Sequence, residues 1–559
     1  MDRNTLLAFL LIALVLIFTP YYMELVSPPP AVAQDSLAIE NMQDYEPPNP
    51  EIKTSNLTRQ TTEQKAVFLS PQSAETEKVY KIETNLYNAS ISSKHGGSLV
   101  SFETINFTNE DSSFLNLINN INKTNLSIRY KDIDGNNIDL GVPWAPEMKY
   151  FDGPISKPTT FSFFLRTGKN KKIKKSLTFY PDRYIIDINI DMSEISDNVF
   201  AGTYSLGWYG GLEKTEKNTQ DDLLYFYSYV FQGGELVDLK VGSGESNSMN
   251  FIGSTDWVAT RTKYFIASIL PSNPGDVVSA YLSGNNNGKE IYDISLSLPA
   301  STSSSLRLYL GPLEYERIKL VGRNLESVMN LGFWIIRPIS KGVLWLLKKM
   351  NQYISNYGVV LIVFSVLIKI LVYPLTKKSY ESTAAMQLLA PEISKIREKL
   401  KNNPQKLNQA TMKLYKDRGV NPLGGCLPML LQMPLLFALF QVFRTTIELR
   451  AEPFVFWIKD LSAPDTIFNL PFTIPLYGSQ VAVLPIIMVI SMFIQQRMMS
   501  GGVEQQPQQK TMQYFMTVFF YILFNSFPSG LNLYYTLFNI LTILQQKLIS
   551  PSSLKTGTG

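Results

Sequence analysis

The sequence is poor in the residues that most often build disulfides, metal centres and catalytic triads. Its 559 residues include a single cysteine, Cys426, and a single histidine, His95. One cysteine forms no internal disulfide, so a water-facing domain must be held by its hydrophobic core. A metal site made of several His or Cys side chains, and a triad that needs both residue types, are excluded. We therefore expect no metal, no cofactor, no catalytic residues and no enzymatic activity.

Two further signatures are missing. The 51 Lys and Arg residues nearly balance the 47 Asp and Glu residues, so the charge does not point to a nucleic-acid role, and we expect no DNA partner. The sequence contains no GxxxxGK[ST] loop, which cradles nucleotide phosphates. The apolar residues, by contrast, are plentiful and unevenly placed.

The N-terminal region pairs an apolar run with a polar stretch. The run Leu6 to Phe18 follows Arg3, and we interpret residues 1–24 as a transmembrane anchor whose N-terminus is cytoplasmic. A cleaved signal peptide is the alternative, with Ala31-Val32-Ala33 as its cleavage site. Residues 25–77 are rich in Pro, Ser, Thr, Gln and Asn, and we expect a flexible periplasmic tether.

Residues 78–322 change to a period of two. Apolar and polar residues alternate in Tyr184–Met192 and in Asp293–Leu298, and turns such as Asp134-Gly135 separate such runs. Half-buried strands produce this alternation. We predict a large antiparallel β-sandwich.

The remaining chain predicts a membrane α-helical bundle. Five apolar runs follow one another, each close to the minimum that crosses a ~30 Å hydrocarbon core. With the anchor they make six transmembrane helices, five of which form a core over residues 351–549, before a short cytoplasmic tail at 550–559. The five runs are Tyr357–Leu375, Leu427–Phe443, Gln480–Gln496, Thr511–Phe527 and Leu531–Ile549.

The segment 323–350, just before this core, is predicted to end in an interfacial amphipathic helix. Arg337, Pro338 and Lys341 interrupt its apolar stretch, Leu331 to Met350. Such a composition suits a helix that lies along the membrane surface. A spanning helix is the alternative.

Charge sets the orientation of the bundle. The loop from Thr376 to Leu427 holds ten Lys and Arg but four acids, whereas the loop from Arg450 to Gly478 holds only Arg450 and Lys459 as cations. The positive-inside rule makes the first loop cytoplasmic and places the β-domain outside the cytoplasm. The protein is thus expected to be multi-pass, with both termini cytoplasmic.

The basic loop is itself predicted to fold as a helical hairpin over residues 376–420. Pro391 splits or kinks its first helix, while Asn403 caps the second, Pro404 begins it and Gly419 ends it. The hairpin either contacts lipid head groups or docks nascent chains or ribosomal RNA. Its basic residues include Lys395, Arg397, Lys399, Lys413, Lys416 and Arg418.

Lys369 is the leading candidate for a functional side chain. It interrupts the apolar run Val359 to Leu375, and charges inside membrane spans mark cavities or transport paths. Lys369 lies eight residues before Lys377, roughly 12 Å along a helix. Snorkelling to the head groups is the alternative, but that depth makes it a long reach. Ser365 lies one turn away on the same face.

The other runs add polar residues at matching depths. Singly, each is more often a contact between helices than a site. Together we expect them to line an amphiphilic groove. They are Gln432, Gln441, Gln495, Asn525, Asn532, Tyr534, Tyr535 and Asn539.

Four motifs then follow one another in order. They are Tyr373-Pro374-Leu375-Thr376, Asn421-Pro422-Leu423-Gly424-Gly425-Cys426, Gln432-Met433-Pro434 and Phe527-Pro528-Ser529-Gly530-Leu531. Together they closely resemble the YidC family of membrane protein insertases, which is related to the mitochondrial Oxa and chloroplast Alb proteins. The anchor and large β-domain resemble the Gram-negative form of that family, which implies a bacterial inner membrane protein whose tether and β-domain lie in the periplasm.

The resemblance implies a membrane protein insertase and chaperone that acts alone or with the Sec translocase. Its hydrated groove opens to the cytoplasm and to lipid, and a positive residue attracts the polar part of a nascent membrane protein. Lys369 occupies that position, where the family usually has Arg, so the charge remains without the planar fork. Ser365 and Tyr535 match client-contacting positions, and we group Gln432 and Tyr534 with them.

Two other classes of function compete. A solute transporter or channel built around Lys369 predicts repeated, symmetric spans with broken helices, and the sequence has no visible internal repeat. A membrane-anchored periplasmic binding protein, or an envelope enzyme, leaves the polar residues inside the spans and the basic hairpin unexplained. The insertase hypothesis accounts for both.

Overall fold

The computed structural model describes residues 76–109, 111–118, 124–167, 171–400, 403–420, 427–474, 477–500 and 507–548. Residues 66–504 and 516–559 form one compact unit, which contains all the sheets and most of the helices. The predicted anchor at 1–24, nearly all of the tether, the Asn421–Cys426 motif and the tail at 550–559 lie outside the described residues.

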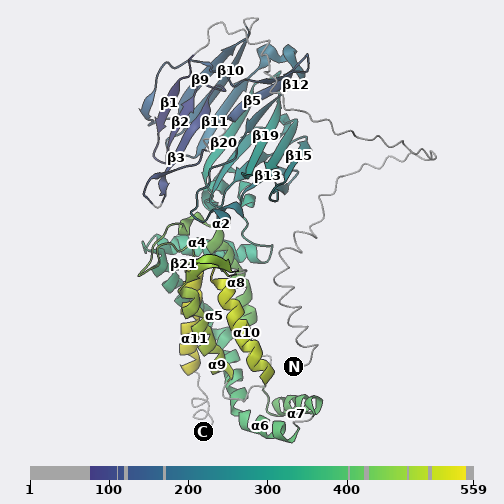
Figure 1. Cartoon of the computed structure of the whole chain (residues 1–559), viewed down its shortest axis with the longest axis vertical. Coiled ribbons are helices and arrows are strands. Elements are labelled where there is room, and N and C mark those ends of the chain that lie inside the picture. The colour runs from purple at the N-terminus through teal and green to yellow at the C-terminus, as the bar shows by residue number, and fades with distance from the viewer. Residues whose placement is uncertain are drawn as a thin grey trace, which may run out of the picture. The chain divides into compact units, whose positions relative to one another are not determined.

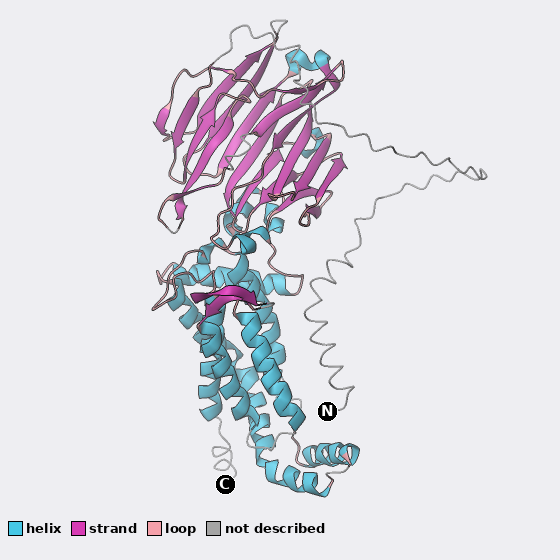
Figure 2. Cartoon of the chain, in the orientation of Figure 1, coloured by secondary structure: helices cyan, strands magenta, loops and turns pink. Residues whose placement is uncertain are grey.

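The first half of the described chain is a β-rich domain of largely antiparallel sheets (Figure 2). Its largest sheet has the strand order β14-β13-β16-β17-β20-β11-β10-β9-β7. These strands are β7 (Ala145–Pro146), β9 (Thr159–Arg166), β10 (Lys172–Phe179), β11 (Ile185–Asp191), β13 (Tyr227–Gln232), β14 (Glu235–Leu239), β16 (Trp257–Arg261), β17 (Phe265–Pro271) and β20 (Ser304–Pro312).

Two smaller sheets complete the domain. The six-stranded sheet packs against the nine-stranded one through β18 and β19, which contact β13 and β16. Its strands are β5 (Asn125–Asp132), β6 (Asn137–Asp139), β12 (Val199–Trp208), β15 (Ser246–Ile252), β18 (Ser279–Asn285) and β19 (Ile291–Pro299). The five-stranded sheet holds β1 (Val79–Glu83), β2 (Tyr87–Ser92), β3 (Ser98–Thr108), β4 (Phe114–Asn116) and β8 (Asp152–Pro154), and β1 and β8 pair in parallel.

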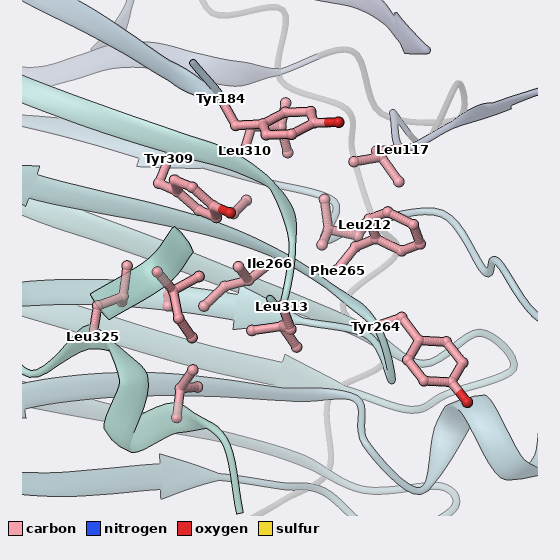
Figure 3. Close-up of a cluster of buried hydrophobic side chains, with 14 of the residues drawn as sticks. Leu117, Tyr184, Leu212, Tyr264, Phe265, Ile266, Tyr309, Leu310, Leu313 and Leu325 are labelled. Atoms are coloured by element: carbon pink, nitrogen blue, oxygen red, sulfur yellow. The ribbon is translucent and has the colours of Figure 1, made fainter. Parts of the chain in front are cut away.

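The alternating pattern of the sequence fixes which residues enter the core. In β11, Ile186, Ile188 and Ile190 are buried, while the residues between them face the other side of the sheet. Side chains alternate between the two faces of a strand, so one register buries every second residue. Figure 3 shows part of this core, in which Tyr184, Tyr309 and neighbouring apolar side chains gather.

Buried Tyr309 also satisfies its polar group. Its hydroxyl donates a hydrogen bond to the Pro312 carbonyl at 2.7 Å, as a buried hydroxyl requires.

Short helices surround the strands, and one amphipathic helix follows them. The short elements are α2 (Thr219–Leu223), α3 (Tyr315–Val321), η1 (Ser193–Asn198), η2 (Pro274–Asp276) and η3 (Leu325–Val328). Helix α4 (Ile336–Asn351) buries Val343, Leu344 and Leu347, packs on α8, and leaves Trp345 exposed. One face is thus apolar and covered, and the other is open.

The second half of the described chain is helical (Figure 1). Helix α11 packs on α5, α8 and α9, and the short helices α6 and α7 pack on each other. The helices are α5 (Tyr357–Leu388), α6 (Ala390–Lys399), α7 (Pro404–Asp417), α8 (Leu427–Thr445), α9 (Leu484–Ser500), α10 (Pro507–Phe524) and α11 (Ser529–Leu548), with η5 (Ile447–Leu449) after α8.

Helix length and apolarity single out one span. Within the described ranges, Tyr357–Pro374 is the one stretch long and apolar enough to cross a membrane by itself, and shorter apolar helices cover Leu484–Met498 and Gln513–Phe524. Helices do occupy the five predicted runs, but length and composition establish this single span rather than the predicted five.

Two helices differ in extent from the predicted runs. Helix α5 continues through Pro374 to Leu388, although its stretch that is apolar enough to cross a membrane ends at Pro374, next to the predicted Leu375. The Thr376 hydroxyl donates to the Val372 and Tyr373 carbonyls at 3.1 Å, and such bonds help a helix to tolerate a proline.

The second difference is in the start of a helix: one apolar run was predicted to start at Gln480, and this start was wrong. Gln480 lies in β22 (Gly478–Ala482), which pairs with β21 (Thr466–Ile474) as a short hairpin. Helix α9 begins only at Leu484, where the Asp465 carboxylate accepts the backbone N–H groups of Val483 and Leu484. Val481 and Ala482 at the end of β22 are apolar and lie just before the apolar helix, so the sequence shows one continuous apolar run.

Other local predictions are confirmed. The Asn403 side chain caps α7 by accepting the Lys406 N–H, Pro404 stands at its first turn, and Gly419 follows it with a positive φ of 67°. Positive φ favours glycine, so the helix stops there. The chain divides at Leu389, next to Pro391, where α6 begins.

Buried charges join loops of the β-domain to the ends of the helices. Asp221 accepts hydrogen bonds from Lys263 at 2.6 Å and from Arg444 at 3.2 Å, and Glu216 pairs with Arg450 at 2.7 Å. Burial opposes ionisation of Asp221, but Lys263 and Arg444 keep its pKa below the usual value. No spacing pattern in the sequence reveals this cluster, because its members are far apart in the chain.

Candidate functional site

Lys369 lies inside the helical bundle, on the middle of α5. Its side chain is 8% exposed, and Ser365 on the same face is fully buried. The Ser365 hydroxyl donates to the Leu361 carbonyl at 2.7 Å, while the Lys369 ammonium bonds to a different helix. The ammonium is therefore enclosed by the protein rather than extended along the surface of the helix.

The surroundings of the Lys369 ammonium are neutral. Its Nζ donates to Thr542 Oγ1 on α11 at 2.7 Å, and it lies 4.5 Å from the ring centre of Phe538 and 5.7 Å from that of Tyr380. In the described part of the chain, no carboxylate lies within 4.0 Å of it. An ammonium has three N–H donors, and the Lys369 ammonium donates one hydrogen bond, to a neutral hydroxyl.

A small cavity lies beside this group, between α5, α8 and α11. It offers about 20 Å³, which is enough for one water molecule. Thr376, Tyr380, Gln432 and Phe538 are among the residues that line it. Gln432 thus lies on the wall of a small cavity next to Lys369.

The two tyrosines of α11 are also buried. Tyr534 is 0% and Tyr535 7% exposed, and neither hydroxyl has a hydrogen-bond partner among the described residues. Their rings meet edge to face with centres 5.2 Å apart, and Tyr534 also contacts Phe364 of α5. Unpaired buried hydroxyls are costly, so these two groups are exceptions to the usual pairing of buried polar atoms.

Two predicted groove residues hold the fold instead of facing Lys369. Asn525 accepts the Ala482 N–H and donates to the Gln480 carbonyl, so it fixes the β21–β22 hairpin. The Asn532 amide donates to the carbonyls of Phe524 and Phe527 and fixes the turn between α10 and α11. These roles are contacts within the protein.

The remaining polar residues are spread over the bundle. Asn539 reaches Ser491 of α9 at 3.1 Å, which ties α11 to α9. Gln441 on α8 and Gln495 on α9 are half-buried.

Of the predicted set, Gln432 lines the cavity beside Lys369, and Tyr534 contacts the Phe538 ring that lies next to the ammonium. Tyr535 instead packs on Phe524 of α10.

The basic residues of α6 and α7 form an open surface. Arg418 pairs with Glu392 at 2.8 Å, an ion pair that links the two helices. Arg397 is half-buried, and the other predicted cations are exposed, namely Lys395, Lys399, Lys413 and Lys416.

The sequence did not indicate two residues near Lys369. Thr542 accepts its hydrogen bond, while Gln545 donates to Thr376 at 3.2 Å and so adds a second polar link between α5 and α11. Gln545 offered a signal, because an amide in an apolar helix is unusual. Thr542 offered none, since threonine is common in such helices.

Comparison with known proteins covers nearly the whole chain. Residues 79–346 match the family described as YidC periplasmic domain, and residues 349–555 match the family described as 60Kd inner membrane protein. A relative from Chlorobium luteolum, named membrane protein insertase YidC, is 34% identical over 99% of this chain and 96% of its own. A relative of the same name from Chloroherpeton thalassium is 33% identical over the same shares.

A solved structure gives a weaker likeness. A crystal structure of an active YidC insertase, with its first transmembrane domain resolved, covers 85% of this chain and 92% of its own at 17% identity and a TM-score of 0.35.

The β-rich domain and the apolar helices with their buried lysine define an inner membrane protein with a periplasmic domain. The chain belongs to the YidC family of membrane protein insertases. Its function is therefore membrane protein insertion, its substrates are nascent membrane proteins, and it is not an enzyme.

Proposed function

We propose that this insertase receives the polar, acidic part of a client at the ammonium of Lys369. The observation that carries this proposal is the isolation of that charge: it is buried, bonded to one neutral hydroxyl, and lacks a carboxylate partner among the described residues. A desolvated charge without a counter-ion is costly. An acidic side chain of the client, or water that accompanies it, lowers that cost.

Ser365, Gln432, Tyr534 and Tyr535 form the wall along which the client's apolar span then moves. Gln432 lines the cavity beside Lys369, and the two tyrosine hydroxyls lack partners, which supports contact with a polar backbone. Gln441, Gln495, Asn525 and Asn532 are subsidiary members, of which the two asparagines act chiefly by holding the wall in place.

Transfer needs no nucleotide in this mechanism. A water-containing groove shortens the distance that a polar segment must cross in hydrocarbon, and so lowers its desolvation cost. Burial of the client's apolar span in lipid then supplies the driving force. Since groove and lipid are both apolar around that span, its exit is nearly balanced and reversible until the polar segment has crossed.

The topology that this mechanism requires has six spans, with both termini cytoplasmic. We infer an anchor at 1–24, a tether at 25–77, a β-domain at 78–322, and a core at 351–549 formed by five helices. Within the segment 323–350, α4 lies along the periplasmic membrane surface. Trp345 on α4 and Trp334 just before it are both exposed. They support this position, because tryptophan favours the interface.

The partners follow from the charged surfaces. The basic side chains of α6 and α7 form a cytoplasmic surface suited to ribosomal RNA or anionic lipid head groups. They are Lys395, Arg397, Lys399, Lys413, Lys416 and Arg418. Cooperation with the Sec translocase is carried over from the family resemblance.

Substitution of Lys369 tests the proposal. In cells depleted of their own insertase, Lys369→Arg should insert clients with acidic translocated segments normally, because the charge persists. Lys369→Ala should impair these clients and spare clients with neutral segments. Lys377→Ala, an exposed lysine on the same helix, is the matched control. Normal insertion of every client by Lys369→Ala would refute the proposal.

A further inference from the structure

The nine-stranded sheet carries a polar pocket on the face opposite the core. It has a volume of about 380 Å³, within the size range of small-molecule sites. The odd-numbered residues of β11 and the outward residues of β20 form its floor, since their even-numbered neighbours on β11 are buried. It lies entirely within the β-domain.

On the floor of the pocket, Arg307 lies opposite Asp187, whose carboxylate already accepts a hydrogen bond from Tyr180. Asp187 and Arg307 are direct partners across β11 and β20, yet they form no ion pair in the described part of the chain. The Asp187 carboxylate instead accepts the Tyr180 hydroxyl at 2.6 Å, and this bond raises the pKa of Tyr180. The Arg307 guanidinium therefore keeps its donors available.

A second arginine lines the same pocket, and a third lies next to one of its lining residues. Arg183, in the turn between β10 and β11, lies over the Tyr180 ring and has only an exposed contact at 3.7 Å with its neighbour Asp182. Arg323 donates through Nη2 to the carbonyl of Ser272, which lines the pocket, while its Nη1 is buried with no hydrogen-bond partner among the described residues.

Burial and the nearby charge of Arg307 lower the pKa of Arg323, and Asp256 opposes them. The charges of Arg307 and Arg323 thus repel each other. An anion bound among them relieves that repulsion.

Neutral polar groups fill the rest of the pocket. Asn189 accepts the Ser305 hydroxyl at 2.6 Å, which leaves the asparagine amide as a donor. The Tyr180 ring supplies a flat apolar wall. Arginine forks suit carboxylate and phosphate groups, while amides and hydroxyls suit the hydroxyls of a ligand.

We propose that this pocket binds a small anionic sugar, one that carries a carboxylate or a phosphate, on the β-domain. Arg307 and Arg183 hold the oxyanion, Asn189 and Ser305 hold ring hydroxyls, and Tyr180 covers one face of the ring. The site is separate from the groove at Lys369 and adds a ligand-binding activity to the insertase.

Calorimetric titration of the purified full-length protein in detergent at low salt tests this site. Glucuronate and glucose 6-phosphate, as carboxylate and phosphate probes, should both bind, and glucose should bind at least about tenfold more weakly. Arg307→Gln and Arg183→Gln should each weaken both probes by about tenfold. Arg183 is exposed, so its substitution cannot act by unfolding the domain.

The matched control is Arg166→Gln, which removes an equal charge from an exposed position at the end of β9. It should change either affinity by less than about twofold. The proposal is overturned if neither anionic sugar binds, if glucose binds equally well, or if Arg166→Gln weakens binding as much as Arg307→Gln. Inorganic phosphate that binds as tightly as glucose 6-phosphate also overturns it, since the sugar then contributes nothing.

Discussion

Lys369 and Thr542 lie on different helices, 173 residues apart, and their atoms Nζ and Oγ1 are 2.7 Å apart. The same threonine hydroxyl donates to the Phe538 carbonyl one turn earlier on α11. Its proton is therefore directed to the backbone, and its lone pair to the ammonium. This geometry holds the charge at the α5–α11 contact without neutralising it.

Thr542→Val should weaken insertion of clients with acidic segments, because the ammonium loses its acceptor and its fixed position. Loss of one such hydrogen bond costs about 1 kcal/mol, or roughly fivefold in rate. Protease protection of a pulse-labelled client in depleted cells measures the effect. Thr536→Val, which removes a buried hydroxyl from the same helix that bonds only to the Asn532 carbonyl, should have little effect.

The double variant Lys369→Ala/Thr542→Val should be no worse than Lys369→Ala alone, since both changes disable one interaction. Additive defects would show that Thr542 acts independently of the lysine.

Crosslinking can locate the client's path. Ser365 of α5 and Tyr535 of α11 are buried among the helices, and Tyr535 packs on Phe524 of α10. Photo-crosslinkers at these positions therefore report a client only if it enters between the helices. Stalled nascent membrane chains should crosslink at 365 and 535. A crosslinker at Ile370, which is 69% exposed on the outer face of α5, should give much less product. Equal labelling at all three positions, or none at the first two, would contradict the groove.

The sequence predicted the elements better than their ends. Period-two runs placed strands such as β11 and β19, because half-buried strands leave a clear trace. It missed the β21–β22 hairpin, whose residues Phe468, Leu470 and Phe472 are as apolar as the helix that follows. Apolarity alone does not distinguish a strand from a helix over so few residues.

The candidate site in the helical bundle was predicted mainly from Lys369, and the structure added the residues that surround it. Lys369 was evident because a charge in an apolar run is rare. Its partner Thr542 was not, and neither was the Asp221–Lys263–Arg444 cluster, whose members are separated by up to 223 residues. Pairs so distant leave no spacing pattern, and only the folded chain brings them together.

Insertion itself should survive removal of the β-domain. Deletion of residues about 50 to 315, with α4 retained, leaves the helices around Lys369 intact. We expect insertion of small clients to continue in depleted cells, although contacts with Sec partners can be lost. A stably expressed deletion protein that inserts nothing would refute this prediction.

The structure identifies a side effect of this deletion that the experiment must control. Arg444 and Arg450 lose Asp221 and Glu216, and a partly buried charge without its partner is destabilising. The deletion protein with Arg444→Gln and Arg450→Gln should therefore accumulate to a higher level than the deletion alone. Equal levels would show that these ion pairs do not matter to the core.

The last prediction concerns Lys175, a fully buried lysine in the β-domain. Its Nζ donates to the carbonyls of His95 at 3.0 Å and Leu126 at 2.6 Å, and so links β10 to β5. Burial lowers its pKa to about 7, whereas an unfolded lysine titrates near 10.4. Between these values the unfolded chain binds more protons, so the stability of the domain should rise with pH.

The slope contributed by Lys175 approaches about 1.4 kcal/mol per pH unit between pH 7.5 and 9.5. Below this range a second group acts, because burial lowers the pKa of His95 to about 4, despite the opposing influence of Asp139. His95 therefore adds a rise of stability from about pH 4 to 6.5. The two windows do not overlap, so one pH series separates the two residues.

Urea unfolding, followed by the fluorescence of the fully buried Trp144, Trp208 and Trp257, measures both windows in the full-length protein. Lys175→Met should abolish the rise between pH 7.5 and 9.5 and leave the His95 rise in place. Lys174→Met, at the exposed neighbouring position of β10, should keep both. Lys175→Met also lowers overall stability, because the carbonyls of His95 and Leu126 lose their donor. The test is therefore the slope of the unfolding free energy against pH, not the urea midpoint at one pH. An unchanged slope in Lys175→Met would mean that the buried lysine remains charged in the folded protein throughout this range.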